Sequence, residues 1–324
     1  MTYLGSERYC HCYHRQTMLY LTESEVQQLL SVKNCIPIMR STFHALREGT
    51  AQNQPRRRLI LKTGSVLHSL AGAYGDYFGT KIYASNPKHG VHFYCTLFDA
   101  NTAEPLVLME ANYLGQIRTG AASGYATDLM ANPHAQVLGV IGSGFQARSQ
   151  VEAMRAVRQI REVRVWSRKA DKAKQFAAQM NAIAVDSAEA AVRGADIVVT
   201  ATNAKDPVIQ KDWIAPGVHI NSMGSNVASR RELPADLVRS AGIVAVDSLE
   251  QAKIEAGDLI LAESWENVVE LKDVEPDYRP ARITIFKSIG LGVEDVAAAG
   301  FIYEQAVAQA VGQVIGFRGL PARE

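Results

Sequence analysis

A glycine-rich turn at residues 140–150, VIGSGFQARSQ, carries the clearest chemical signal in the chain. It links the apolar run QVLGVI to a helical stretch, which distinguishes its Gly-x-Gly-x-x-Ala pattern from an ordinary glycine-rich loop. In a dinucleotide site the first glycine permits a tight turn, the second lets the backbone approach a pyrophosphate, and the small Ala147 lets helix and strand pack closely. The helix N-terminus adds free N–H groups and a partial positive charge. We therefore expect a dinucleotide site formed by Gly142, Ser143, Gly144, Phe145 and Gln146.

The end of the next strand should decide which nicotinamide cofactor is bound. NAD sites usually place Asp or Glu there, against the ribose 2′-hydroxyl. In this chain VRVWSRKADKAK places Ser167, Arg168 and Lys169 at that point. A hydroxyl and two cations would attract a 2′-phosphate, and the guanidinium of Arg168 can bind it through two donors at once. The alternative is an ordinary solvated basic loop. We predict that NADP(H) is preferred over NAD(H).

The elements that would position these residues alternate regularly from residue 136 onward. Short apolar runs (QVLGVI, EVRVWS, DIVVTAT, GVHINSM and GIVAVDS) alternate with helical stretches. Continuously apolar strands separated by helices predict an α/β fold, a doubly wound parallel sheet of the Rossmann type. Ligands of such sheets bind at the carboxyl ends of the strands, where the glycine turn and the basic loop lie.

Residues 18–110 have a different pattern and predict an α+β unit. TESEVQQLL begins with a capping-box spacing, Thr22 and Glu25, which starts an amphipathic helix. Several β-rich runs follow, and the turn DANTAEP between the last two predicts a hairpin or meander. The stretch LGQIRTGAASGYATDLMA (114–131) then predicts a helix whose small residues suit close packing.

The two ends of the chain differ in character. Residues 293–317 predict one long helix with apolar residues at three- and four-residue spacing, and we expect it to pack back on the first unit. Residues 1–17 lack such patterning, so we expect a flexible extension. Its CHCYH run (10–14) groups two cysteines and two histidines, but metal sites usually space their ligands as CxxC or HxxxH. No metal site is predicted.

Composition narrows the class of protein. The chain has 324 residues, 47% of them hydrophobic, and a net charge of +1, which gives no electrostatic footprint for nucleic acid or an anionic membrane. No apolar run approaches the roughly 20 residues that span a bilayer. Four cysteines in a chain of this length are not a disulfide framework. We expect a soluble protein of the cytoplasm.

Taken together, the motifs resemble the ornithine cyclodeaminase/μ-crystallin family. The matching stretches include MLYLTESEV, GTKIYASNP, QIRTGAASGYAT, VIGSGFQARSQ, INSMGSN, VDSLEQAKIEAGDL and FKSIGLGVEDVAAAGFIYEQA. The resemblance implies a substrate and dimerisation domain of residues 18–118 with 296–324, and a Rossmann domain of residues 119–295. It also implies a homodimer.

The resemblance assigns roles to individual residues. Lys81 in GTKIYASNP matches an active-site lysine beside the nicotinamide, and Arg118 in QIRTGAAS matches an arginine that binds the substrate carboxylate. A second carboxylate arginine lies in QPRRRLIL, where Arg57 fits best and Arg56 and Arg58 are the alternatives. The strand ends that should border the cofactor carry Thr202, Met223, Gly224 and Ser288.

One position departs from the family pattern. Cyclodeaminases carry Asp where this chain has Asn226, two residues after Gly224. Cyclodeamination begins with an amine that must lose a proton, and a carboxylate can relay that proton whereas a carboxamide cannot. Asp236 and Asp247 are the other carboxylates that could reach the site. Imine reduction has smaller demands, so Asn226 favours a reductase.

The leading hypothesis is an NADPH-dependent reductase of small cyclic imino acids such as Δ1-pyrroline-2-carboxylate or Δ1-piperideine-2-carboxylate. Lys81 would supply the proton, Arg57 and Arg118 would hold the carboxylate, and Asn226 would orient substrate or water. A second hypothesis is an ornithine cyclodeaminase or an alanine-type amino-acid dehydrogenase. A third, of another class, is a μ-crystallin-like protein that binds NADPH or a small ligand with little turnover.

Overall fold

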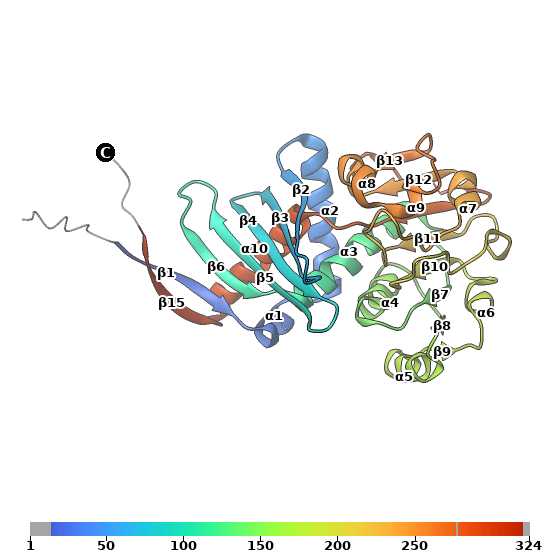
Figure 1. Ribbon diagram of the computed structural model, residues 1–324, viewed down its shortest axis with the longest axis horizontal. Coiled ribbons are helices and arrows are strands. Elements are labelled where there is room, and N and C mark those ends of the chain that lie inside the picture. The colour runs from blue at the N-terminus through green and yellow to red at the C-terminus, as the bar shows by residue number, and fades with distance from the viewer. Residues whose placement is uncertain (1–13, 277, 320–324) are drawn as a thin grey trace, which may run out of the picture.

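The computed structural model describes residues 14–276 and 278–319 of the chain. Two sheets, one mixed and one parallel, lie beside each other with helices between and around them (Figure 1). The predicted α/β class with a parallel sheet and a second α+β unit is therefore confirmed. None of the helices in these two ranges combines the length and the apolar character that crossing a bilayer requires.

The first sheet has seven strands in the order β15-β1-β6-β5-β4-β3-β2. Its central part is the predicted meander, in which each strand from β2 to β6 pairs antiparallel with the next. The strands are β1 (His14–Leu21), β2 (Gln52–Ile60), β3 (Val66–Tyr74), β4 (Tyr77–Asn86), β5 (Gly90–Asp99), β6 (Pro105–Glu110) and β15 (Gln313–Gly319).

Helix α10 (Gly292–Gln309) covers one face of this sheet, together with α1 (Glu23–Leu29) and α2 (Val32–Glu48) on the same side (Figure 1). The approach is close, because a Cβ added to Gly72 of β3 would lie 2.5 Å from the Cα of Val293. The predicted return of the C-terminal helix onto the first unit is thus confirmed. We call the face of the sheet that meets α10 the inner face.

The second sheet has eight parallel strands in the order β13-β12-β14-β11-β10-β7-β8-β9. The strands are β7 (Val137–Ile141), β8 (Glu162–Trp166), β9 (Ile183–Ala184), β10 (Ile197–Thr200), β11 (His219–Ser222), β12 (Ile243–Val246), β13 (Val268–Glu270) and β14 (Thr284–Lys287). The α-helices that connect them are α4 (Phe145–Val157), α5 (Ala170–Met180), α6 (Ala188–Val192), α7 (Ala235–Ser240), α8 (Leu249–Glu255) and α9 (Gly257–Ile260). The strand order reverses at β7, which lies between β8 and β10, and such a reversal opens a crevice at the carboxyl ends of the strands.

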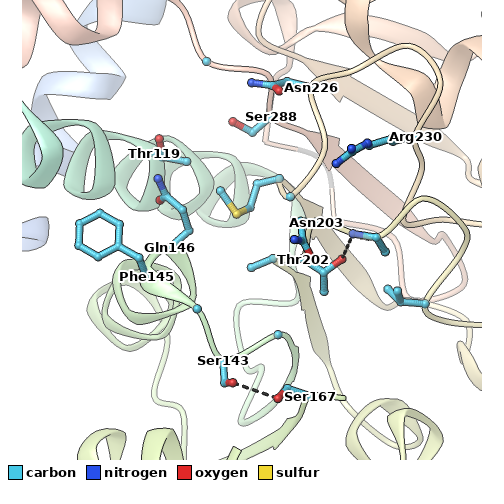
Figure 2. A pocket seen from close by; sticks show the side chains of 18 of the residues that line it. Thr119, Ser143, Phe145, Gln146, Ser167, Thr202, Asn203, Asn226, Arg230 and Ser288 are labelled. Carbon is cyan, nitrogen blue, oxygen red and sulfur yellow. Dashed lines mark hydrogen bonds between the residues drawn. The ribbon is translucent and has the colours of Figure 1, made fainter. Parts of the chain in front are cut away.

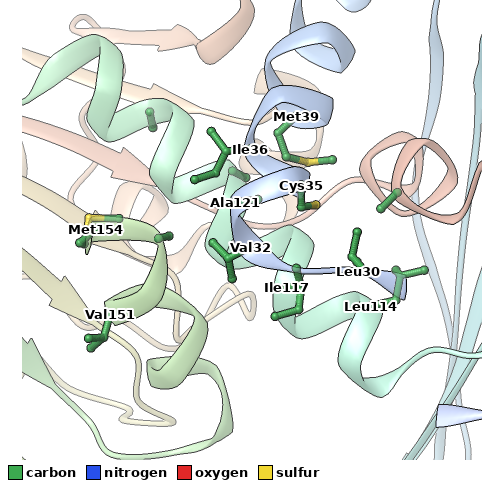
Figure 3. Packing of buried hydrophobic residues seen from close by; sticks show 14 of the residues in the cluster. Leu30, Val32, Cys35, Ile36, Met39, Leu114, Ile117, Ala121, Val151 and Met154 are labelled. Carbon is green, nitrogen blue, oxygen red and sulfur yellow. The ribbon is translucent and has the colours of Figure 1, made fainter. Parts of the chain in front are cut away.

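Helix α3 (Asn112–Met130) joins the two units and is buried along most of its length. Its small residues permit close contacts: a Cβ on Gly120 would lie 2.6 Å from the carbonyl oxygen of Ser149, and one on Gly124 3.0 Å from the Cδ1 of Ile36. Figure 3 shows side chains of α2, α3 and α4 meeting in one apolar cluster. Because α3 is continuous through residues 118 and 119, the expected domain boundary falls inside a helix that both units share.

Two expectations about the ends of the chain are wrong. Residues 14–17, expected in a flexible extension, belong to β1, which pairs antiparallel with β15. The predicted helix over 293–317 ends at Gln309, because Ala310 takes a left-handed conformation (φ 52°), and β15 follows. Cys10 and Cys12 of the CHCYH run lie outside the described residues.

Candidate active site

A cleft of about 1430 Å³ runs along the carboxyl ends of the parallel strands and reaches the inner face of the first sheet. Every residue to which the sequence analysis assigned a catalytic or binding role lines it, except Arg57; of the residues named only as alternatives, Arg56 lines it. Those that line it are Lys81, Arg118, Gly142, Ser143, Gly144, Phe145, Gln146, Ser167, Arg168, Lys169, Thr202, Met223, Gly224, Asn226 and Ser288. Figure 2 shows part of this cleft, with Ser143 and Ser167 at one end and Asn226 and Ser288 at the other.

The glycine turn lies where the order of the parallel strands reverses. Gly142 follows β7 with φ 109°, a conformation that favours glycine, and an added Cβ would collide with the carbonyl oxygen of Ala201 after β10. An added Cβ on Gly144 would meet nothing within 4 Å, so the backbone there faces open space. Gly144 is also the N-cap of α4, and no side chain caps that helix. These features fit a dinucleotide pyrophosphate, which could take the free N–H groups of the helix.

The basic loop after β8 forms the adjoining part of the cleft. Ser143 donates a hydrogen bond to Ser167 (3.0 Å), whose hydroxyl donates to the carbonyl of Lys169 (3.1 Å). Arg168, Lys169 and Lys172 are exposed and line the cleft. Among the residues that the structure describes, none of these three cations forms an ion pair with a carboxylate. The loop thus presents uncommitted positive charge where a dinucleotide site receives the adenosine ribose.

A buried carboxylate ties together the strand ends that border the cofactor region. Glu232 accepts hydrogen bonds from the amide and hydroxyl of Thr202 (both 2.7 Å) and from the amide of Gly224 (2.7 Å). Asp258 in turn accepts from the amide of Glu232 (2.6 Å) and forms an ion pair with the buried Lys287 (2.8 Å). The sequence analysis did not identify this group, because nothing in RRELP distinguishes Glu232 from a surface glutamate.

At the other end of the cleft, Lys81 and Arg118 share one carboxylate. Lys81 Nζ lies 2.6 Å and Arg118 Nε 2.8 Å from the same oxygen of Asp295, and Arg118 Nη1 lies 2.8 Å from Glu294. Figure 1 shows why these groups meet: α10 crosses the inner face of the sheet that carries Lys81. All four side chains are buried, so each charge depends on the others for compensation.

Burial and the charge of Arg118 lower the pKa of Lys81 to about 8, although Asp295 opposes the change. Burial also raises the pKa of Glu294 to about 8, reinforced by Asp247 and opposed by Arg118. Burial alone would lower the pKa of Arg118, but Asp295 and Glu294 together raise it, so that the guanidinium stays charged. The site therefore combines one permanent cation with an amine that can exchange a proton near neutral pH.

The second arginine that lines the cleft is Arg56. The prediction that Arg57 would face the cleft is wrong, because its side chain is exposed on the other face of the sheet. Gln54 of β2 pairs with Ala71 of β3, but Arg57 pairs with Ser69, so three steps along β2 match two steps along β3. Strand β2 therefore contains one extra residue, a β-bulge. Counted from Gln54, this bulge sends Arg57 to the exposed side and Arg56 into the cleft. Arg56 bonds to Glu255 (3.1 Å) and to the carbonyl of Ile289 (2.8 Å). Simple alternation along QPRRRLIL could not reveal the bulge.

Asn226 lines the cleft at the same end as Ser288 (Figure 2). The backbone carbonyl oxygen of Asn226 accepts a hydrogen bond from Arg58 (3.1 Å), which fastens the loop after β11 to the first sheet. Neither of the two alternative carboxylates lines the cleft: Asp236 lies on α7, and Asp247 is buried with its carboxylate on the amide of Gly290 (2.7 Å). Asp206 is the one acidic side chain among the described lining residues.

Several lining residues were missed by the sequence analysis. Tyr83 and Phe93 lie on the inner face of the sheet near Lys81, and Arg230 extends toward the cleft from the loop after Asn226 (Figure 2). A signal existed for Tyr83, since it follows Lys81 by two residues in a strand and must share its face. The paired acids Glu294 and Asp295, which do not line the cleft, also carried a signal, because two adjacent charges begin a helix whose first three turns are otherwise apolar.

The comparisons with known proteins agree with this geometry. A model of the ornithine cyclodeaminase/mu-crystallin family matches residues 15–310. The alanine dehydrogenase of Archaeoglobus fulgidus is 35% identical over 321 residues, which cover 92% of this chain and 98% of the relative. A Δ1-pyrroline-2-carboxylate reductase of Bacillus cereus is 40% identical over 238 residues, which cover 68% of this chain and 73% of the relative.

Two solved structures are similar over nearly their whole length. The Δ1-pyrroline-2-carboxylate reductase of Thermococcus litoralis, in complex with NADH and L-proline, has a TM-score of 0.86 and 31% identity, covering 91% of this chain and 99% of that one. An archaeal alanine dehydrogenase dimer with bound NAD has a TM-score of 0.88 and 31% identity, covering 93% and 99%.

Proposed function

Because the chain belongs to the ornithine cyclodeaminase/mu-crystallin family and is an NAD(P)-dependent oxidoreductase of C=N or CH–NH bonds, we propose that it reduces small cyclic imino acids with NADPH. Δ1-Pyrroline-2-carboxylate and Δ1-piperideine-2-carboxylate are the proposed substrates, and the cyclic amino acids are the products. The observation that carries the proposal is the substrate end of the cleft, where Lys81, Arg118 and Arg56 gather and where Asn226 stands in place of a carboxylate.

The substrate carboxylate is the natural partner of Arg118. Its Nε and Nη1 bind Asp295 and Glu294, while Nη2 donates to no acceptor among the described residues. A free N–H on a permanently charged, buried guanidinium is a strong site for a carboxylate. Arg56 adds a second positive charge, although its own donors are largely engaged by Glu255 and the carbonyls of Ile289 and Gly290.

The proton for the imine nitrogen is assigned to Lys81. When bound, the reduced nicotinamide supplies a hydride to the imine carbon, so that the C=N bond becomes CH–NH and one proton is consumed. With a pKa of about 8, most of the Lys81 side chain is protonated at neutral pH, and it is a stronger acid than an ordinary lysine. Asp295 holds the ammonium 2.6 Å away and so fixes its direction. Asn226 is neutral and could orient substrate or water at this end of the cleft.

The preference for NADPH rests on this chain's own loop. Ser167, Arg168 and Lys169 replace the acidic residue that a 2′-hydroxyl would bind, and Lys172 adds a further cation. The similar reductase and alanine dehydrogenase structures hold NADH and NAD. They therefore support a nicotinamide dinucleotide as the cofactor and do not themselves favour NADPH.

A homodimer is proposed through the outer face of the first sheet, which α10 does not cover. Five large apolar side chains are exposed on it: Leu59, Leu67, Phe78, Ile82 and Tyr94, each between 37% and 61%. A contiguous apolar face on an antiparallel sheet usually marks an interface. A second copy is the proposed occupant, in keeping with the dimeric state of the similar alanine dehydrogenase.

The test is a panel of cyclic ketimines assayed by NADPH oxidation, with alanine and ornithine assayed in the oxidative direction. We expect ketimine-dependent oxidation of NADPH and no formation of proline from ornithine. Alanine oxidation with NAD is the second candidate, favoured by the full-length similarity to an alanine dehydrogenase. Absence of any ketimine reduction, with alanine or ornithine turned over instead, would overturn the proposal.

A further inference from the structure

An aromatic row lies on the inner face of the first sheet, one step from Lys81. His68 of β3 pairs with Tyr83 of β4, and Tyr83 pairs with Phe93 of β5. Since Tyr83 follows Lys81 by two residues, both side chains point to the same face. The Tyr83 ring lies between its neighbours, with its centroid 4.1 Å from that of His68 and 4.7 Å from that of Phe93.

The ends of this row are fixed to the two sides of the substrate region. At one end Arg58 pairs with His68 across the strands and donates a hydrogen bond to the carbonyl of Asn226. At the other end the carbonyl of Phe93 accepts from the amide of Ala111 (3.1 Å), the N-cap of the helix that carries Arg118. Tyr83 and Phe93 both line the cleft. The row therefore forms a wall between the loop of Asn226 and the start of α3.

The stacking decides which part of Tyr83 meets a ligand. Both faces of its ring are covered, at interplanar angles of 6° to His68 and 28° to Phe93, which leaves the ring edge and the hydroxyl. The face of an aromatic ring attracts cations, whereas its edge is the positive part of the quadrupole. His68 adds no charge of either sign, because burial lowers its pKa to about 4 and the imidazole is therefore neutral at neutral pH.

The charges around the wall act in the same direction. Arg56, Lys81 and Arg118 line the adjoining part of the cleft, whereas the carboxylates that pair with them are fully buried and do not line it. Asp206, the acidic lining residue, belongs to the loop after β10 rather than to the first sheet. A substrate side chain that ends in an ammonium would thus lose water here without gaining a counter-charge.

We infer that Tyr83, held between His68 and Phe93, selects imino acids with a compact apolar ring or side chain and excludes those with a terminal ammonium. The inference rests on the proposed function, because it names the substrate class of the same site. It assigns Tyr83 a role in specificity and leaves proton transfer to Lys81.

The test compares two amino acids that differ only at the end of the side chain. Norvaline ends in a methyl group, and ornithine carries an ammonium on the same three-carbon chain. Calorimetric titration into the NADPH-loaded enzyme measures both dissociation constants without turnover. We expect norvaline to bind at least about tenfold more tightly, since only ornithine leaves a buried charge unpaired.

Variants locate the preference. Tyr83→Val removes the ring edge and should lower the norvaline preference by about threefold or more, the remainder being set by the neighbouring cations, whereas Tyr83→Phe should retain the full preference. Tyr125→Val is the matched control, because Tyr125 also stacks on an aromatic ring, that of Phe43 at 5.9 Å, but does not line the cleft. It should keep the full preference, and thermal melting verifies that each variant is folded.

Two results would overturn the inference: equal binding of ornithine and norvaline by the wild type, or an unchanged preference in folded Tyr83→Val. Failure of the proposed function is seen separately, as the absence of ketimine-dependent NADPH oxidation by the wild type. If the protein reduces no ketimine but its preference for norvaline still depends on Tyr83, the proposed reaction is wrong and the role of Tyr83 in selectivity is retained.

Discussion

The pKa of Lys81 makes a quantitative prediction about the pH dependence of imine reduction. Its side chain is 3% exposed, and burial with the charge of Arg118 lowers its pKa from 10.5 to about 8. A group with that pKa is about 90% protonated at pH 7 and about 10% at pH 9, whereas an ordinary lysine remains charged throughout this range. If the ammonium supplies the proton, kcat/KM should fall about tenfold between pH 7 and 9.

The perturbation that isolates the amine is Lys81→Arg. A guanidinium stays charged beyond pH 12, so this variant should lose the alkaline fall as well as about 10²- to 10⁴-fold of the plateau rate. Asp295→Asn should shift the fall instead of abolishing it: the variant lacks the carboxylate that raises the pKa of Lys81, so the midpoint of the fall should move from about pH 8 to a lower pH. Asp295 also pairs with Arg118, so thermal melting must show that this variant is folded.

The assay is initial-rate NADPH oxidation at saturating cofactor, from pH 6 to 10, with two imines of different pKa. A fall that moves with the substrate belongs to the imine and not to the enzyme. Glu294→Gln is the second control. The pKa of Glu294 also lies at about 8, so a fall in rate that persists in this variant does not come from Glu294. A flat profile in the wild type up to pH 9.5, or the same fall in Lys81→Arg, would refute the reasoning.

Three further outcomes follow from the same geometry. Arg168→Ala should lower kcat/KM for NADPH by about 10- to 100-fold, the loss of one charge-assisted hydrogen bond, and leave NADH unchanged; equal losses for both cofactors would contradict the 2′-phosphate assignment. Gly142→Ala should weaken cofactor binding measured by fluorescence titration and lower the melting temperature, because φ 109° and the Ala201 carbonyl both oppose a Cβ; unaltered affinity would contradict the tight turn. Ile82→Glu should convert the proposed dimer to a monomer in sedimentation, because it places a charge on the proposed interface; a dimer that persists would place the interface elsewhere.

Much of the cofactor half follows from local pattern. A dinucleotide turn needs glycines between an apolar strand and the start of a helix. Gly142 and Gly144 meet this requirement within the eleven residues 140–150, so the sequence alone predicts the turn. The same is true of Ser167, Arg168 and Lys169, since the end of β8 necessarily meets the edge of the sheet where β7 ends. Alternation likewise places Tyr83 on the same face as Lys81.

The substrate half depends on contacts that no local pattern contains. One extra residue in β2 exchanges the faces of Arg56 and Arg57 relative to the start of the strand. The left-handed Ala310 ends α10, and β15 follows from Gln313 as an edge strand that pairs with β1 from the other end of the chain.

The sequence by itself determined the class of fold, the glycine turn and the charge of the loop beside it, because each depends on neighbours a few residues apart. Only the tertiary structure decided the electrostatics of the active site. Asp295 lies 214 residues from Lys81 and 177 from Arg118, yet one of its oxygens contacts both. The proton affinity of Lys81 is a property of that buried cluster, since desolvation and charge–charge interactions depend on distance in space and not on distance along the chain.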